Sequence, residues 1–268
     1  MKIFISVDME GLWGVTSSLQ IRRGNTDYER TRKLMTEEVN IVVRALFEEG
    51  VSEVLINDSH ASMDNVLIEE LDERVSLISG NQKPLSMMQG ISQDFDGVIF
   101  IGYHPRALTE KGIFDHTYSG LSIHNVMING KPLGEFGLNA RLAGYYSVPV
   151  IFASGDNVFC QQVIEEAGNI ETLTVKNTIS RYSAKSIPKK ALISGYRKGI
   201  KRALISRGML IKEKTPMICR IAFKESVMME DVLWLEGIKK LNHHEIEFEA
   251  EDYEKLYRKF LAVLKLAR

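Results

Sequence analysis

The chain has 268 residues, of which 44% are hydrophobic, with 34 Lys and Arg against 35 Asp and Glu. The formal charge of -1 argues against nucleic-acid or anionic-membrane partners, and no apolar run approaches the ~20 residues that span a bilayer. No secretory signal precedes the opening strand, and the two cysteines, Cys160 and Cys219, lie isolated in apolar segments. We therefore expect a globular cytoplasmic protein of one or two domains, with neither nucleic acid nor membrane as a partner.

The opening stretch MKIFISVDMEG is the most informative part of the sequence. Residues 2–7 form an apolar, β-branched run that predicts a buried strand, and Asp8 and Glu10 follow it directly. Carboxylates at positions i and i+2 project from the same side of an extended chain. They repel each other unless a cation or a basic partner lies between them. The alternative is an ordinary solvated turn, for which Asp, Glu and Gly are common residues.

Hydrophobic patterning predicts alternating strands and helices over the first hundred residues. A one-sided helix is expected over residues 27–50, capped by Thr26 or Asp27 and ended by Gly50. Strands are expected at residues 52–57, 75–78 and 95–102, with a short helix or turn at 66–71. This alternation favours a mostly parallel sheet with helices on its faces.

The rest of the chain changes character twice. A loop-rich stretch ends in an expected hairpin turn at Asn129-Gly130. Helices are then expected at 135–146, 157–168, 184–208 and 253–266, and strands at 148–153, 171–176, 217–223 and 245–250. The predicted fold class is α/β, a mostly parallel sheet flanked by helices with a smaller C-terminal α+β lobe. We place the catalytic domain at residues 1–180 and the lobe at 181–268, with one continuous domain as the alternative.

Candidate metal ligands lie where the predicted strands end. Asp8 and Glu10, His60 and His104 each follow a strand, and sites in open α/β sheets form outside the carboxyl ends of the strands. With Glu135 they make three carboxylates and two imidazoles, a donor set that suits zinc or another divalent metal, including a pair of bridged ions. Hydrogen-bonded structural histidines remain the alternative, since no compact metal signature is present.

Several ordered motifs resemble the D-aminopeptidase family of dinuclear zinc peptidases. The motifs are SVDMEG at 6–11, NDSH at 57–60, GYH at 102–104 and GEFGLNA at 134–140. Flanking segments extend the similarity as far as ASGD at 153–156 and VKNTISR at 175–181. The resemblance covers about the first two-thirds of the chain in order and fades toward the C-terminus.

The resemblance implies a dinuclear zinc site and a peptidase activity. Asp8 would bridge two Zn²⁺ ions per subunit, and Glu10, His60, His104 and Glu135 would complete the site. His116 matches the family's catalytic histidine, although its FDHTYSG surroundings differ from the family's usual hydroxyl-flanked form. The implied enzyme removes the N-terminal residue of short peptides, including peptides of D-amino acids, as a homo-oligomer of two stacked pentamers.

Two other readings of the same residues stay open. One is a different metal-dependent amidase or hydrolase that uses the same ligands, and the other is a non-enzymatic metal-binding oligomeric assembly. Asn57 and Asp58 are candidates for fixing the orientation of His60, and Asn139, one helical turn after Glu135, is a candidate for orienting substrate. Each of these also fits a plain structural role.

Overall fold

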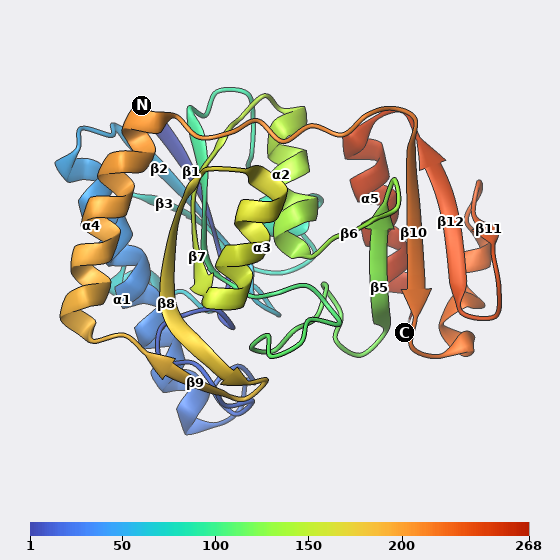
Figure 1. Cartoon of the computed structure of the whole chain (residues 1–268), viewed down its shortest axis with the longest axis horizontal. Coiled ribbons are helices and arrows are strands. Elements are labelled where there is room, and N and C mark those ends of the chain that lie inside the picture. The colour runs from blue at the N-terminus through green and yellow to red at the C-terminus, as the bar shows by residue number, and fades with distance from the viewer. Residues whose placement is uncertain (268) are drawn as a thin grey trace.

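A computed structural model describes residues 1–267 and contains two β-sheets with helices packed around them. The larger sheet lies between two helical layers, and the smaller sheet lies to one side of it (Figure 1). Within the described residues, no helix is both long and apolar enough to cross a membrane. Cys160 and Cys219 are both buried and unpaired, as the sequence predicted.

The larger sheet has seven strands in the order β3-β2-β1-β4-β7-β8-β9. All neighbouring pairs are parallel except β8 and β9. The mostly parallel sheet expected from the alternating pattern is therefore confirmed. The strands are β1 (Lys2–Val7), β2 (Glu53–Asp58), β3 (Ser76–Ile78), β4 (Gly97–Tyr103), β7 (Val150–Asp156), β8 (Glu171–Ser180) and β9 (Ser183–Ser186).

Helices cover both faces of this sheet, and each face has its own hydrophobic core. Helices α1 (Thr26–Glu48) and α4 (Lys189–Ser206) pack on one face, where Ile3, Ile5 and Val7 of β1 point. Helices α2 (Glu135–Tyr145) and α3 (Asn157–Ala167) pack on the other face, together with Phe4 of the same strand. This period-two alternation explains why the central strand is apolar throughout, as expected for a strand buried on both sides.

Helix α1 follows the predicted pattern closely. Its buried residues form one stripe along the helix, among them Met35, Val39 and Leu46, which is the spacing of a one-sided helix. The side chain of Asn25 accepts a hydrogen bond from the amide of Tyr28 and caps the helix. The prediction of Thr26 or Asp27 as the cap was therefore wrong by one or two residues.

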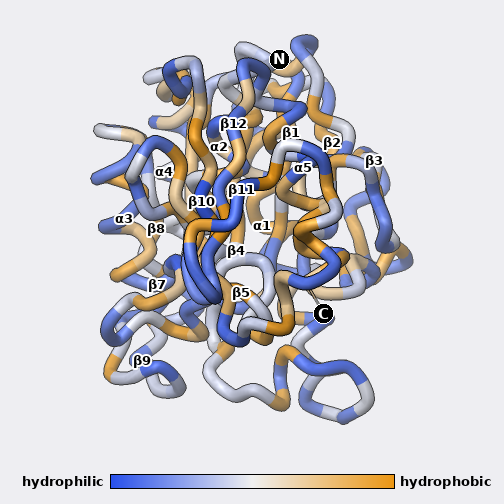
Figure 2. Tube along the Cα trace, turned by 90° about the vertical axis from the view of Figure 1, so that its right-hand side faces the viewer, coloured by the Kyte–Doolittle hydropathy of each residue, from blue (hydrophilic) through white to orange (hydrophobic). Residues whose placement is uncertain are grey.

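The second sheet is antiparallel, with strand order β11-β12-β10-β5-β6. Helix α5 (Tyr253–Leu266) packs against its strands and against α2. Figure 2 views the molecule from the side of this sheet and shows β11 as hydrophilic. The strands are β5 (Ile123–Ile128), β6 (Lys131–Pro132), β10 (Met217–Phe223), β11 (Lys239–Lys240) and β12 (Glu245–Ala250).

One helix starts later than predicted, because its expected first residues form a strand. Residues 183–186 make β9, which pairs with β8, and α4 begins at Lys189 directly after Pro188. Proline before a helix disfavours the helical conformation of the residue ahead of it, which explains the boundary. Strand β8 also continues to Ser180, four residues beyond its predicted end.

The two sheets exchange segments along the chain. Strand β9 and helix α4 follow residue 180 and lie on the larger sheet, whereas β5 and β6 precede it and lie in the smaller sheet. The smaller α+β part thus combines a hairpin from the middle of the chain with its last fifty residues. A division into domains at residues 180 and 181 stays a prediction.

Candidate metal centre

The six residues singled out in the sequence lie together at the carboxyl edge of the larger sheet. Asp8 and Glu10 follow β1, His60 follows β2, and His104 follows β4. Glu135 is the first residue of α2, and His116 lies in the connection between β4 and β5. All of them are buried except His116, whose side chain is 20% exposed.

A close approach of two backbones brings the ends of β1 and β4 together. The amide of Gly11 donates to the carbonyl oxygen of Gly102 at 2.7 Å. A β-carbon on Gly11 would lie 1.8 Å from the carbonyl oxygen of Tyr103, and Gly102 has a φ of +68°. Only glycine fits at Gly11, and the turn at Gly102 favours glycine as well. These two residues therefore set the spacing between Asp8 and His104.

Asp8 divides the cluster into two groups of donors. Its Oδ1 lies 3.4 Å from Nδ1 of His60, and the same nitrogen is 2.8 Å from Oε2 of Glu10. Its Oδ2 lies 3.5 Å from Nε2 of His104, and that nitrogen is 3.3 Å from Oε2 of Glu135. Each oxygen of Asp8 thus faces one histidine and one further carboxylate. This is the arrangement that a bridging carboxylate requires.

Backbone carbonyls hold the rings of the two candidate histidine ligands. Nε2 of His60 lies 2.9 Å from the carbonyl oxygen of Ile21, and Nδ1 of His104 lies 2.9 Å from that of Pro105. In each ring one nitrogen therefore donates its proton to a backbone carbonyl, and the other nitrogen points at the carboxylates, where deprotonation would leave it a lone pair for a metal. This is the usual support for a metal-binding histidine.

His116 lies beside the second donor group. Its ring stacks on that of His104, with centroids 4.1 Å apart and planes 6° apart. Nδ1 donates to the carbonyl oxygen of Phe114 at 2.8 Å, which leaves Nε2 with a lone pair, 3.4 Å from Oε1 of Glu135. Phe114 and Tyr118, two residues on either side, have φ values of +48° and +60°. Bulky residues seldom adopt this conformation, and such strain is common at functional sites.

Burial and close charges shift every pKa in the cluster. Burial and the charge of Glu10 raise the pKa of Asp8 to about 8. Burial lowers the pKa of both candidate histidine ligands, but their carboxylate neighbours outweigh it: the pKa of His104 rises to about 10 and that of His60 well above its usual value. Burial also lowers the pKa of His116, and the charge of His104 adds to this. His116 therefore favours the neutral form.

Two atoms of the cluster indicate that a cation fits it. Oδ2 of Asp8 and Nε2 of His104 are fully buried and have no hydrogen-bond partner among the described residues. Buried polar atoms almost always have a partner. Donor atoms of His104, His116 and Glu135, and of Asp8, Glu10 and His104, lie within 4.8 Å of one another in each group. Imidazole and carboxylate donors at this spacing fit zinc or another divalent first-row metal.

A cavity of about 180 Å³ adjoins the cluster and is lined by Asp8, Glu10, His60, His116 and Glu135, together with Ser59, Ala61, Met63, Met87 and Tyr118. A second hollow of about 250 Å³ shares Glu10 and His116 with it and continues outward to Arg22, Leu121, Arg181 and Tyr182. The cluster is thus reached through a vestibule with polar and apolar walls. The inner cavity is small, which suits one end of an extended ligand.

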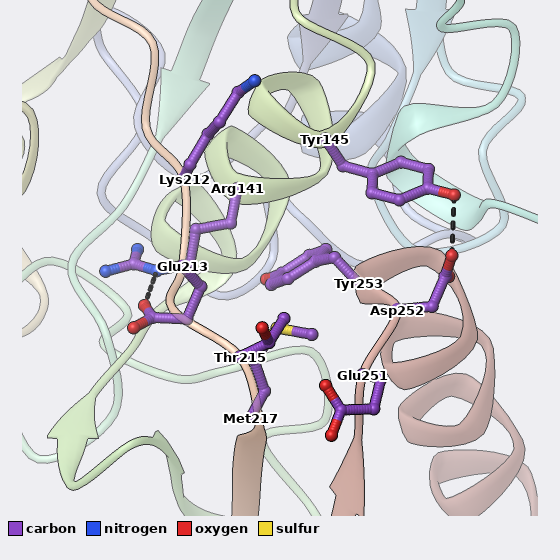
Figure 3. Close-up of a pocket in the computed structure, with 9 residues that line it drawn as sticks. All are labelled: Arg141, Tyr145, Lys212, Glu213, Thr215, Met217, Glu251, Asp252 and Tyr253. Atoms are coloured by element: carbon purple, nitrogen blue, oxygen red, sulfur yellow. Dashed lines mark hydrogen bonds and ion pairs between the residues drawn. The ribbon is translucent and has the colours of Figure 1, made fainter.

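A third pocket, of about 190 Å³, lies away from this cluster between α2, the strand β10 and the start of α5 (Figure 3). Its central cation, Arg141, donates to Glu213 at 2.9 Å and also pairs with Glu166. Tyr145 donates to Asp252 across the opposite side of the pocket at 2.8 Å. These contacts link α2 to α3, to the segment before β10 and to the start of α5, and the pocket is lined by none of the candidate ligands.

The two residues predicted to fix the orientation of His60 hydrogen-bond to groups other than its ring. Asp58 accepts the amides of Asn65 and Val66, and Asn65 in turn donates to the carbonyl oxygen of His60. Asp58 thus stabilises the turn that carries His60, and the His60 ring itself is held by the carbonyl oxygen of Ile21. Asn57 donates to Ser59 and accepts from Lys83.

Asn139 lies under the cavity in a network of hydroxyl groups. It accepts from Tyr118 and Tyr257 and donates to Tyr103. Sequence reasoning missed Tyr118, whose backbone amide donates to Oε1 of Glu135 at 2.7 Å. Its place two residues after His116, in the same motif, was the available signal.

An α/β fold with buried carboxylates and histidines at the carboxyl edge of its sheet defines a candidate metalloenzyme. A family model described as D-aminopeptidase matches residues 1–262. The D-aminopeptidase of Bacillus subtilis (strain 168) is 43% identical over 192 residues, which are 71% of this chain and 69% of that protein. The chain therefore belongs to the D-aminopeptidase family.

A solved structure gives the same result for the fold. It is described as the Zn-dependent D-aminopeptidase DppA from Bacillus subtilis, a self-compartmentalizing protease. The two folds agree with a TM-score of 0.95 at 34% sequence identity, over 100% of this chain and 98% of that one. The similarity thus continues through the C-terminal part, where the sequence motifs had faded. The predicted family, fold class and peptidase activity are confirmed.

Proposed function

We propose that this protein is a zinc-dependent aminopeptidase that removes the N-terminal residue from short peptides of D-amino acids, with two Zn²⁺ ions per subunit. The observation that carries the proposal is the division of donors by Asp8. One ion would be held by Asp8, Glu10 and His60, and the other by Asp8, His104 and Glu135. The relative of known structure is described as Zn-dependent, and the donor types here are those that zinc prefers.

Two zinc ions in such a site would polarise the peptide carbonyl group and make water a nucleophile near neutral pH. The protein would contribute position and proton transfer. The inner cavity would hold the N-terminal residue of the substrate, and the vestibule with Arg22 and Arg181 would hold the remainder. Burial of the donors in a site of low polarity would strengthen each electrostatic interaction.

His116 would carry the proton in catalysis. Its Nε2 is free because Nδ1 donates to Phe114, and its lowered pKa keeps that nitrogen unprotonated at neutral pH. A neutral imidazole at the edge of the cavity can take a proton from the attacking water and return it to the leaving amine. A covalent adduct between a substrate fragment and His116, detected by mass spectrometry, would instead assign it the role of nucleophile.

The test is hydrolysis of matched D- and L-configured dipeptides by protein stripped with a strong chelator and then reloaded. We expect hydrolysis of the D-dipeptides to disappear on stripping and to return with two equivalents of zinc per subunit. Activity that survives complete stripping would overturn the metal mechanism. Cleavage of simple amides but not of peptides would favour a different metal-dependent amidase.

The assembly and location belong to the same proposal. The solved relative is described as a self-compartmentalizing protease, and on that basis this chain would form a homo-oligomer that encloses its active sites. The family resemblance of the sequence makes ten subunits, in two stacked pentamers, the expected number. Two buried, unpaired cysteines fit a reducing cytoplasmic setting. Native mass spectrometry would measure the assembly, and a monomer at micromolar concentration would contradict it.

A further inference from the structure

A buried lysine reaches the loop that follows β1. Lys176, in strand β8, is 0% exposed, and its Nζ lies 2.6 Å from the carbonyl oxygen of Glu10, 2.9 Å from that of Leu12 and 2.6 Å from that of Val15. All three acceptors belong to residues 10–15, which begin with a candidate ligand. The lysine itself comes from strand β8, three places away from β1 in the sheet.

The three contacts match the chemistry of an ammonium group. A protonated lysine has three N–H donors and no acceptor, so three carbonyl oxygens at hydrogen-bond distance use every donor. A neutral amine would turn its lone pair toward one of these oxygens. No contact is left over for a substrate, and Lys176 does not line the cavity beside the cluster.

The loop has few strong contacts of its own. Its internal backbone hydrogen bonds, from Leu12 to Met9 and from Val15 to Leu12, are 3.2 and 3.3 Å long. The remaining strong contacts come from outside. The amide of Gly11 donates to the carbonyl oxygen of Gly102 at 2.7 Å. The amide of Trp13 donates to Glu38 at 2.9 Å, and its indole donates to the carbonyl oxygen of Ile187 at 2.6 Å. The conformation of residues 10–15 therefore depends on groups from other elements.

A buried charge is a costly way to fill space. Burying an ammonium group is unfavourable unless its partners compensate for the lost hydration, and a methionine of similar length would avoid that desolvation. The three hydrogen-bonded carbonyl groups therefore explain why a charged lysine occupies this buried position. Those groups in turn fix the backbone of Glu10, whose carboxylate faces His60 at 2.8 Å.

We infer that Lys176 is a positioning residue for the metal site: it holds the backbone of residues 10–15 so that the Glu10 carboxylate points at His60. Glu38 of α1 contacts the same loop through Trp13. Its two carboxylate oxygens accept from Trp13 and from Tyr196 of α4, at 2.9 and 2.5 Å. The loop is thus held by a buried cation and a buried acid on different elements.

The experiment compares Lys176→Met with the native protein and with Ile221→Ala, a core substitution in β10 of the second sheet that serves as a matched destabilised control. Amide hydrogen exchange of residues 11–15 is measured first. Zinc affinity is then measured by competition with a chromophoric chelator. We expect faster exchange in that loop, and an affinity of one of the two metal sites lowered by about 10–100-fold, the usual effect of losing a supporting contact.

The Ile221→Ala control should keep both metal sites, and amide exchange in residues 11–15 should stay as slow as in the native protein, although the thermal midpoint falls. Unchanged exchange and unchanged affinity in Lys176→Met would overturn the inference. The metal readout rests on the proposed function, but the two can fail separately: native protein that binds no zinc would defeat the proposed function, whereas loop exchange would still test Lys176.

A second variant covers the case in which Lys176→Met does not fold. Glu38→Leu keeps the approximate size of the side chain but removes both acceptor oxygens, so that the amide of Trp13 loses its partner. We expect a smaller effect in the same direction, with loop exchange faster and one metal site weaker. A folded Glu38→Leu protein with native exchange in residues 11–15 would contradict the proposed network.

Discussion

His104 and His116 stack face to face, with ring centroids 4.1 Å apart and planes separated by 6°. The stack fixes the position of the His116 ring, and its hydrogen bond to Phe114 fixes the rotation of that ring. Two imidazolium ions cannot share this geometry without strong repulsion, so only one of the rings takes a proton readily. The carboxylates next to His104 favour protonation there, and His116 is left neutral.

Replacing His116 should separate catalysis from metal binding. For His116→Asn we expect turnover of a D-configured dipeptide to fall by about 10²–10⁴-fold, the range associated with a general acid or base. Zinc content should stay at two ions per subunit, because the five proposed ligands are intact. Steady-state kinetics and elemental analysis on the same preparation check this, and loss of zinc along with activity would make His116 a ligand.

The three carboxylates should differ in how many ions they hold. Asp8→Ala should lose both ions, because each of its oxygens faces a different donor group. Glu10→Ala and Glu135→Ala should each lose one ion, because each faces only one histidine. Elemental analysis after dialysis gives the count per subunit. Equal losses in all three variants would refute the bridging role of Asp8.

Metal binding should release protons at neutral pH. The raised pKa values of His60 and His104 mean that the stripped site holds protons at pH 7, and these must leave before the nitrogens bind a metal. Zinc affinity should therefore fall by about tenfold per displaced proton for each unit that the pH drops. Titration calorimetry in buffers of different ionisation enthalpy counts the protons, and a count of zero would contradict the assigned pKa shifts.

The same shifts predict the stability of the stripped protein. A histidine whose folded pKa is raised contributes stability that is full below its unfolded value of 6.5 and is lost as the pH rises through about 10. The pKa of Asp8 is raised to about 8, so its contribution to stability is also lost as the pH rises. The thermal midpoint of stripped protein should therefore fall between pH 7 and pH 8, by about 2–4 °C for each kcal/mol lost. Above pH 8 the lowered pKa values of the buried Lys83 and Lys176 act in the opposite direction and offset the histidines. A midpoint that rises between pH 7 and pH 8 would oppose the prediction.

Most residues of this site could be predicted from the sequence because they directly follow predicted strands. A parallel sheet brings the carboxyl ends of its strands to one edge, so His60 and His104 could be expected near Asp8 although they lie far apart in sequence. Hydrophobic runs gave those strands to within one or two residues. The proposed role of His116 came only from the family resemblance, since a histidine in a long loop has no position that periodicity can predict.

Other features of the fold and the site could be recognised only in the three-dimensional structure. Lys176 lies at a buried position of a strand, and nothing in its spacing says that it reaches three carbonyl groups across the sheet. The membership of β5 and β6 in the second sheet depends on pairing with β10, more than eighty residues later in the chain. Contacts of this kind are determined by tertiary packing, which local sequence propensity does not predict.

The approach of β1 and β4 at Gly11 gives a final prediction. A β-carbon there would lie 1.8 Å from the carbonyl oxygen of Tyr103, so Gly11→Ala must move the ends of the two strands apart. We expect a loss of about 1–3 kcal/mol in the free energy of unfolding, the usual cost of overpacking. The movement should also widen the gap between Asp8 and His104, so that zinc affinity falls together with stability.

Gly130→Ala is the matched control. Gly130 lies in the turn between β5 and β6 with a φ of +78° and open space around its α-carbon, so alanine should cost about 1–2 kcal/mol through backbone conformation alone. Denaturant unfolding of the stripped proteins gives the two stabilities, and chelator competition gives the two zinc affinities. The control should bind zinc as the native protein does. If Gly11→Ala also binds zinc with native affinity, the spacing of these strand ends does not control the metal site.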